Sequence, residues 1–239
     1  PIGPYSAATL CECLGKCQRC GGTGLEISTT GGGYNYIKPC RQCGVVRRNA
    51  RLYNAAGIPA KYHNVTEVHS FQPKGRHLQQ AASYVKEFVK NYPNMRGFLL
   101  MGGSGLGKTH LAIAAISELT LERGVQCIFK DFFYLLSELK DAYSQGVSEN
   151  EVIQPLIESE ILVIDELGKG KSSEWELNIL DQLISKRYNA SKITLATTNY
   201  ISSGYENTQG RDVLEERVGE RIASRLSEMC EFLLLRGED

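Results

Sequence analysis

The sequence predicts an α/β fold in which a parallel β-sheet is flanked by helices and is preceded by a small metal-binding module. Three observations predict it: a glycine-rich loop between an apolar run and a helical pattern, a second apolar run that ends in two carboxylates, and two Cys-x-x-Cys pairs near the N-terminus. A chain of 239 residues is long enough for one α/β domain and a small second module.

The glycine-rich loop matches the phosphate-binding pattern G-x-x-x-x-G-K-T. Glycines allow the backbone N–H groups to point at phosphates, and the N-terminus of the following helix adds a partial positive charge. We expect Lys108 to reach the β and γ phosphates and the Thr109 hydroxyl to bind Mg²⁺. The predicted nucleotide contacts are Gly102, Gly103, Ser104, Gly105, Leu106, Gly107, Lys108, Thr109, His110 and Asp165.

A buried strand over residues 161–164 is predicted to deliver Asp165 and Glu166 to the same site. Asp165 would hold Mg²⁺ and Glu166 would deprotonate the attacking water. The phosphate loop disfavours the simpler alternative, an exposed acidic turn after a core strand. The strand over 193–199 ends at Asn199, which is either a sensor of the γ phosphate or a turn former. A parallel sheet would place Asn199 at the same edge as Asp165.

Cys17, Cys20, Cys40 and Cys43 have the spacing of a zinc site in which each Cys-x-x-Cys pair supplies two thiolates to one tetrahedral ion. Four thiolates close the coordination sphere, so this Zn²⁺ would be structural and not catalytic. The alternative is a disulfide framework, which is disfavoured in an intracellular nucleotide-binding chain. Cys11 and Cys13 either replace one ligand pair or stand free.

Charge is unevenly distributed. Residues 1–51 carry seven Lys or Arg and two Glu, a net charge of +5, and because the whole chain is neutral the remainder carries −5. The basic segment suits nucleic acid or an acidic protein surface, or is simply a solvated face. No apolar run approaches the ~20 residues needed to span a bilayer, and no signal peptide is visible, so we expect a soluble, cytoplasmic protein with no membrane partner.

The remaining apolar patterns predict further elements in chain order. Helices are predicted over 45–53, 78–89, 132–143, 149–158, 173–189 and 213–228, and strands over 98–101, 125–129 and 230–235. These elements divide the chain into a zinc-binding module (1–50), a linker with one helix (51–93) and a nucleotide-binding domain (94–239).

Three arginines occupy the last predicted helix. Arg217, Arg221 and Arg225 follow one another at intervals of four residues and would share one stripe. A guanidinium on this stripe is suited to enter a neighbouring subunit's site and to stabilise the transferring phosphoryl group. The alternative is a set of surface salt bridges with glutamates of the same helix.

Together these motifs resemble the DnaC/IstB-like AAA+ ATPases, a family that includes bacterial and phage replicative-helicase loaders. The resemblance covers the chain from about Cys17 to its end. Many members have a second Asp where this chain has Glu166. The segments that carry the resemblance are the zinc module, Gly57-Ile58-Pro59, Gly102 to Thr109, Ile164 to Gly168, Thr197-Thr198-Asn199 and Gly219 to Leu226.

The resemblance implies a P-loop NTPase fold of the AAA+ type, with a five-stranded parallel sheet and a domain over 94–239 that hydrolyses ATP with Mg²⁺. It also implies a homo-oligomeric spiral or ring with ATP between subunits. By motif, Arg225 resembles the arginine finger, and Arg221 is the other candidate. Lys169 and Lys171 are further candidates for contacts with nucleic-acid phosphates.

The same resemblance implies a DnaB-type replicative helicase and single-stranded DNA as partners. The zinc module resembles the part that grips the helicase, and the segment Phe132 to Gly146 lies where loaders contact DNA. The leading expectation is an ATP-dependent helicase loader that releases its partners on hydrolysis. Two alternatives stay open: an IstB-like transposition ATPase acting on duplex DNA, and a nucleotide-gated scaffold. The zinc module favours the loader.

Overall fold

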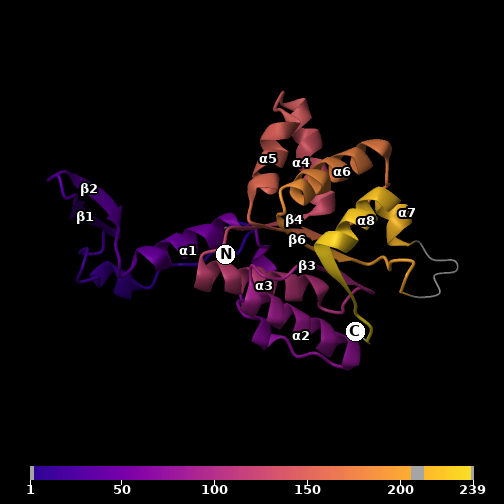
Figure 1. Cartoon of the computed structure of the whole chain (residues 1–239), viewed down its shortest axis with the longest axis horizontal. Helices are drawn as coiled ribbons and strands as arrows, with labels where there is room; N and C mark the ends of the chain where they lie inside the picture. Colours follow the sequence, from indigo (N-terminus) through magenta and orange to yellow (C-terminus); the bar gives the residue numbers. More distant parts are fainter. Residues whose placement is uncertain (1–2, 206–212, 238–239) are drawn as a thin grey trace.

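The computed structural model describes residues 3–205 and 213–237 (Figure 1). Among these residues, no helix combines the length and apolar character that crossing a bilayer requires. The strands are β1 (Leu25–Thr29), β2 (Asn35–Pro39), β3 (Gly97–Met101), β4 (Cys127–Asp131), β5 (Ile161–Asp165), β6 (Ile193–Thr198) and β7 (Cys230–Leu234). The α-helices are α1 (Gly44–Ala55), α2 (Arg76–Asn91), α3 (Lys108–Arg123), α4 (Phe132–Ser144), α5 (Glu149–Glu158), α6 (Glu174–Asn189), α7 (Leu214–Val218) and α8 (Glu220–Met229).

The main sheet has five strands in the order β4-β5-β6-β3-β7, and every neighbouring pair is parallel. This confirms the predicted five-stranded parallel sheet of the AAA+ type. Because β3 lies beside β6, and β6 beside β5, the carboxyl ends of these three strands meet at one edge. Ligands of open parallel sheets bind outside that edge.

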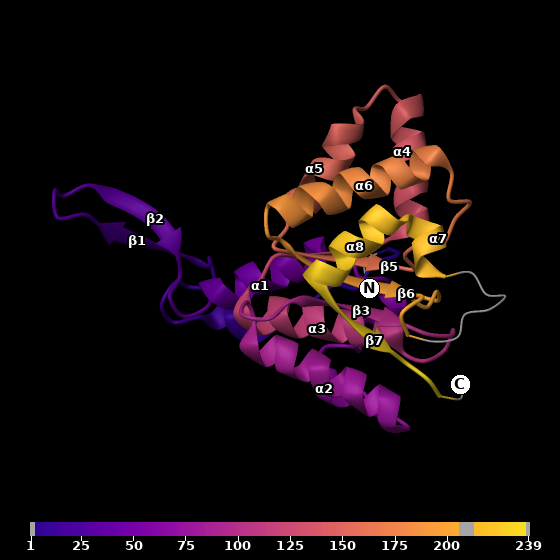
Figure 2. The same cartoon turned by 45° about the vertical axis from the view of Figure 1, so that its right-hand side comes forward.

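Helices cover both faces of the sheet (Figure 2). Residues of one strand alternate between the faces. In β3, Phe98 and Leu100 pack into a core with helices α1, α2 and α3. Their neighbours Leu99 and Met101 pack into a second core with α4, α5, α6 and α8. The continuous apolar runs noted in the sequence are therefore strands buried on both sides.

The cysteine-rich module extends away from the sheet (Figure 1). Strands β1 and β2 form an antiparallel hairpin, and α1 starts at Gly44, directly after Cys43. Helix α1 then packs along α3, where the Asn49 side chain donates a hydrogen bond to the Leu121 carbonyl at 2.9 Å. One continuous helix thus joins the cysteines to the domain that carries the phosphate loop.

The C-terminal helix differs from the prediction. A single helix over 213–228 was expected, but the helix is interrupted at Gly219, whose φ of 86° lies outside the helical region. The break separates α7 from α8, so Arg217 lies on a different helix from Arg221 and Arg225. The prediction of one three-arginine stripe is therefore wrong.

Arg187 of α6 is fully buried, and its bonds are to oxygens of neutral groups. Its guanidinium donates to the carbonyls of Leu156 at 2.6 Å and Ile193 at 2.5 Å and to the Thr194 hydroxyl at 3.0 Å. Burial lowers the pKa of Arg187 to about 10. This residue ties α6 to the end of α5 and to β6, and thereby fixes one helical layer on the sheet.

Replacing Arg187 with Met would leave these carbonyls buried without donors. We expect the Arg187→Met variant to lose about 3 kcal/mol of unfolding free energy, measured by urea titration. Lys186→Met, at the exposed neighbouring position, should stay within about 0.5 kcal/mol of the parent. Equal midpoints for the two variants would contradict this role for Arg187.

Candidate functional site

The phosphate loop connects β3 to α3 at the carboxyl edge of the sheet. Gly107 precedes the helix with a φ of 82°, a left-handed conformation that favours glycine. A Cβ at this position would lie 2.6 Å from the Phe71 ring, so the loop also needs glycine for space. The first turn of α3 consequently presents its N–H groups where a phosphate can bind.

Lys108 lies across the mouth of this loop. Its Nζ donates hydrogen bonds to the carbonyls of Gly102 at 2.8 Å and Gly103 at 2.6 Å, and to Oδ1 of Asn199 at 2.8 Å. The structure therefore brings together two residues for which the sequence predicted contact with the γ phosphate. An amide beside this ammonium is placed to contact the same phosphate oxygens.

Asp165 ends β5 beside the loop and is largely buried. Its Oδ1 accepts hydrogen bonds from the Thr109 hydroxyl at 2.8 Å and the Thr197 hydroxyl at 2.5 Å. Burial raises the pKa of Asp165, and the two threonines oppose this rise. A carboxylate and a hydroxyl are the hard oxygen donors that Mg²⁺ prefers, so Asp165 and Thr109 fit the predicted metal.

Glu166 follows Asp165 with a φ of 54°, which is uncommon for a residue other than glycine. Its N–H donates to the Thr197 hydroxyl at 3.1 Å, and its side chain forms an ion pair with Lys169. Since Glu166 and Lys108 line the same cavity, the carboxylate lies where it can act on water beside a γ phosphate.

This cavity has a volume of about 260 Å³. It is lined by Tyr62, Ser104, Gly105, Gly107, Lys108, Thr109, His110, Glu166, Thr197 and Asn199. The sequence analysis missed Tyr62, which precedes the loop by a long segment and matches no motif. It quoted Thr197 only as part of a family segment. His110 lies against Phe71, with ring centroids 5.6 Å apart, and burial lowers its pKa.

Arg217 holds the loop that follows Glu166. Its guanidinium donates to the Gly168 carbonyl at 3.1 Å and to the Gly170 carbonyl, and it stacks over the Tyr200 ring at 5.0 Å. The Ser172 hydroxyl in turn donates to the Arg217 carbonyl at 3.1 Å. Arg217 thus acts within its own chain and links α7 to the loop that follows Glu166.

The two other arginines lie together on α8, against α6. Arg225 donates to Asp181 at 2.7 Å and to the Ser185 hydroxyl, and its side chain is 20% exposed. Arg221 lies 3.6 Å from the same carboxylate and is 71% exposed. Asp181, which the sequence analysis did not single out, orients both guanidinium groups.

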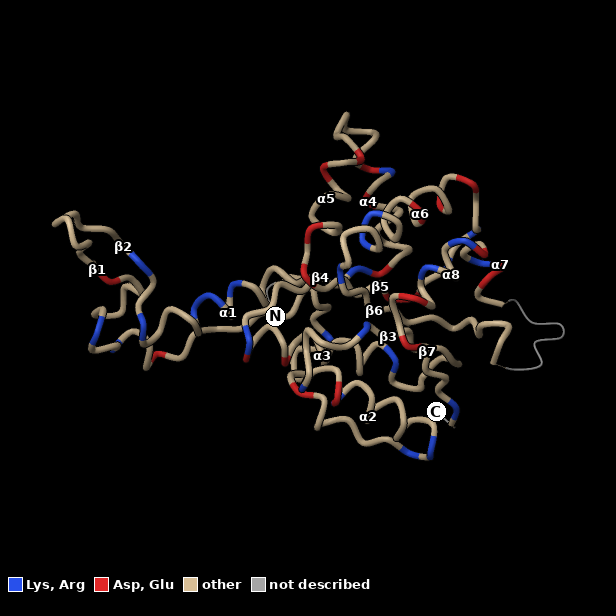
Figure 3. The backbone as a smooth tube through the Cα atoms, viewed as in Figure 1, with Lys and Arg blue, Asp and Glu red and all other residues tan. Residues whose placement is uncertain are grey.

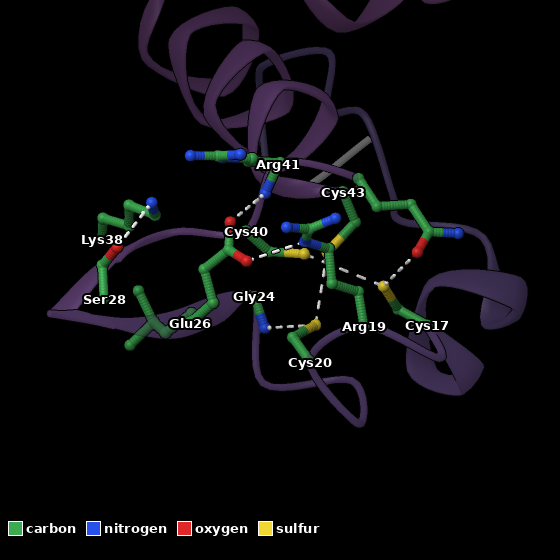
Figure 4. Close-up of polar contacts among 12 residues, drawn as sticks. Cys17, Arg19, Cys20, Gly24, Glu26, Ser28, Lys38, Cys40, Arg41 and Cys43 are labelled. Carbon is green, nitrogen blue, oxygen red and sulfur yellow. Dashed lines mark hydrogen bonds and ion pairs between the residues drawn. The ribbon is translucent and has the colours of Figure 1, made fainter.

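The four predicted zinc ligands converge on one point (Figure 4). Their sulfur atoms all lie within 4.8 Å of one another, with Cys17 to Cys40 at 3.9 Å and Cys20 to Cys43 at 3.6 Å. A tetrahedral ion with Zn–S bonds of about 2.3 Å separates its sulfurs by about 3.8 Å, so these thiols fit zinc. Burial raises the pKa of Cys20, but the Gly24 N–H and the neighbouring thiols outweigh it and lower the pKa to about 6.

Cys11 and Cys13 lie outside this cluster. Both are exposed, and Cys11 accepts a hydrogen bond from the Cys13 N–H at 3.3 Å. All eight cysteines are described and none forms a disulfide, so the disulfide alternative has no support in the structure. Neither residue replaces a ligand of the cluster formed by the described residues.

Comparison with known proteins identifies the family to which the chain belongs. The profile of IstB-like ATP-binding proteins matches residues 41–238. The chain belongs to this family. The replicative helicase loader DnaC of Escherichia coli strain K12 is 29% identical over 180 residues, which cover 74% of this chain and 68% of DnaC.

Solved structures of similar proteins share the fold. A crystal structure of the DnaC helicase loader superposes with a TM-score of 0.64 and 29% identity, covering 74% of this chain and 99% of that one. A crystal structure of DnaI gives a TM-score of 0.59 at 21% identity, with 72% of this chain and 89% of that chain covered. The family, the sheet order and the phosphate loop identify an AAA+ ATPase.

The family match starts at residue 41, so of the four clustered cysteines only Cys43 falls within it. The hairpin and the other three cysteines precede the matched region, to which α1 connects them. The matched region contains all five strands of the parallel sheet.

The cysteine cluster makes a prediction about metal content. Protein prepared without chelators should contain about one zinc per chain by elemental analysis. Cys20→Ser should lose the metal because it removes a ligand of the closed tetrahedral site. Cys11→Ser is the matched control and should keep it. Equal zinc in both variants, or none in the parent protein, would rule out the site.

Proposed function

We propose that this protein is an ATP-dependent loader of a replicative DNA helicase. In this role it binds the helicase and single-stranded DNA, and releases them when it hydrolyses ATP during DNA replication. The observation that carries the proposal is the complete phosphate site in a domain similar over most of its length to a protein named as a helicase loader. A loader of this kind works in the cytoplasm.

The ATPase residues have separate tasks in the proposal. Lys108 neutralises charge on the β and γ phosphates, and Asn199 contacts the γ phosphate from the next strand. Thr109 and Asp165 would hold Mg²⁺, which supplies charge neutralisation between the β and γ phosphates. Glu166 orients the water and takes its proton. The tight contact of Asn199 with Lys108 supports this division of tasks.

We further propose that the cysteine module grips the helicase. The hairpin exposes an apolar face, on which Ile27 is 75% and Ile37 69% exposed, and these two residues are direct cross-strand partners. Contiguous exposed apolar residues are typical of protein-interaction sites. Lys and Arg lie around the same module (Figure 3), which suits an acidic rim on the partner.

The loader proposal predicts a specific complex. The full chain, mixed with the replicative helicase of its own host, should co-elute with it on size exclusion in the presence of ATP. The double variant Ile27→Ser, Ile37→Ser should bind the helicase at least tenfold more weakly, because it removes the apolar contact. It should keep its zinc, because it removes none of the four cysteines. Phe133→Ser, an exposed apolar residue of α4, is the control and should bind normally.

Two outcomes would favour a function other than helicase loading. Absence of any helicase complex, together with ATP-dependent assembly on duplex DNA, would favour the transposition-type ATPase. A stable complex whose formation and release are unaffected by Glu166→Gln would favour a scaffold that uses nucleotide only to assemble.

The proposal also assigns the arginines of α8 to a neighbouring subunit's site in a spiral or ring. Arg225→Ala should keep ATP binding and lose turnover by about 10³-fold, the usual contribution of an arginine finger. Lys108→Ala should lose ATP binding. When the two inactive variants are mixed, turnover should return, because mixed oligomers contain intact sites with Lys108 from one subunit and Arg225 from the other.

Arg221→Ala, tested in the same way, distinguishes the two candidates, since only the true finger is rescued by mixing. Normal turnover by an Arg225→Ala and Arg221→Ala double variant, or hydrolysis by an isolated monomer at the rate of the oligomer, would contradict an intersubunit finger.

A further inference from the structure

The loop after β5 contains an ion pair that the phosphate-site motifs do not explain. The Lys169 ammonium donates to Oε2 of Glu166, and this bond raises the pKa of the lysine. The side chain of Lys169 is 57% exposed, and exposed pairs contribute little to stability. The contact engages one carboxylate oxygen and leaves the other for a second partner.

The backbone around this pair is held at several points. The Leu167 N–H donates to the Thr197 carbonyl at 2.8 Å, and the Lys169 N–H donates to the Glu166 carbonyl at 3.0 Å. Arg217 binds the carbonyls of Gly168 and Gly170, on either side of Lys169. The backbone of Lys169 is therefore held in place, and the bond from its ammonium restricts the rotamer of the Glu166 side chain.

We propose that Lys169 is a positioning residue that orients the Glu166 carboxylate for attack by water on ATP. The inference rests on the proposed role of Glu166 as general base. Lys169 binds Oε2, while Oε1 accepts the proton from the water whose oxygen attacks the γ phosphorus, and ADP leaves with the bridging oxygen. A base oriented by a third group is a recurring arrangement in enzymes, because small displacements of the base are costly.

An alternative role is a contact with nucleic-acid phosphate, which any exposed lysine can make. The geometry separates the two roles. A phosphate-binding lysine needs its ammonium for the ligand, whereas Lys169 already uses it on the catalytic carboxylate. Lys186, an exposed lysine of α6 outside this loop, provides the control.

The test measures steady-state ATP hydrolysis by the full chain without DNA. We expect Lys169→Met to lower kcat about tenfold and to leave KM within about twofold, because it misplaces the base and does not touch the nucleotide. Lys169→Arg, which keeps a donor of the same charge, should restore most of kcat. Lys186→Met should match the parent protein.

Glu166→Gln separates failure of this inference from failure of the proposed base. Glu166→Gln should abolish turnover, and adding Lys169→Met to it should cause no further loss. If Glu166→Gln is fully active, the base assignment is wrong. If Glu166→Gln is inactive but Lys169→Met has normal or raised kcat, only the role of Lys169 is wrong.

The remaining readout is DNA affinity, measured by fluorescence anisotropy with a labelled single-stranded oligonucleotide. Lys169→Met should bind it as tightly as the parent protein does. Weakened DNA binding by Lys169→Met with an unchanged kcat would assign the lysine to phosphate contact and overturn the proposal.

Discussion

The hydrogen bonds that Asp165 accepts from Thr109 and Thr197 are the contacts on which the site depends. They join α3, β5 and β6 at a single carboxylate oxygen, and the bond from Lys108 to Asn199 joins the phosphate loop to the same edge. Such convergence requires a parallel sheet in which β3 lies next to β6 and β6 next to β5. The strand order therefore determines which side chains meet at the site.

Two further parts of the chain connect to this edge. Helix α1 carries the cysteine cluster at its N-terminus and packs on α3, the helix that starts at Lys108. On the other side, Arg217 of α7 holds the loop that carries Glu166 and Lys169. The module proposed to grip a partner thus reaches the phosphate loop through α1 and α3, and α8, whose arginines are proposed to face a neighbour, reaches the loop after β5 through α7. These are short physical routes for coupling.

Much of this arrangement follows from sequence because it depends on local patterns. Glycine spacing, continuous apolar runs and paired cysteines predicted the loop, the buried strands and the metal cluster. Contacts between segments distant in the sequence leave no local pattern from which they could be predicted. The break at Gly219 was missed because Glu and Arg continue a helical pattern across it, and the roles of Arg217, Asp181 and Tyr62 depend on packing between elements. The bond between Lys169 and Glu166 was also missed, because it depends on the turn that Glu166 forms with a φ of 54°.

The most direct test of the account is a loading assay on circular single-stranded DNA, which a closed helicase ring cannot thread. Helicase retained on the circle would be counted after a high-salt wash, with ATP and either the parent protein or Glu166→Gln. The account predicts that the parent protein deposits active helicase free of loader, while Glu166→Gln leaves helicase and loader bound together and inactive. Equal deposition of active helicase with and without this protein would contradict it.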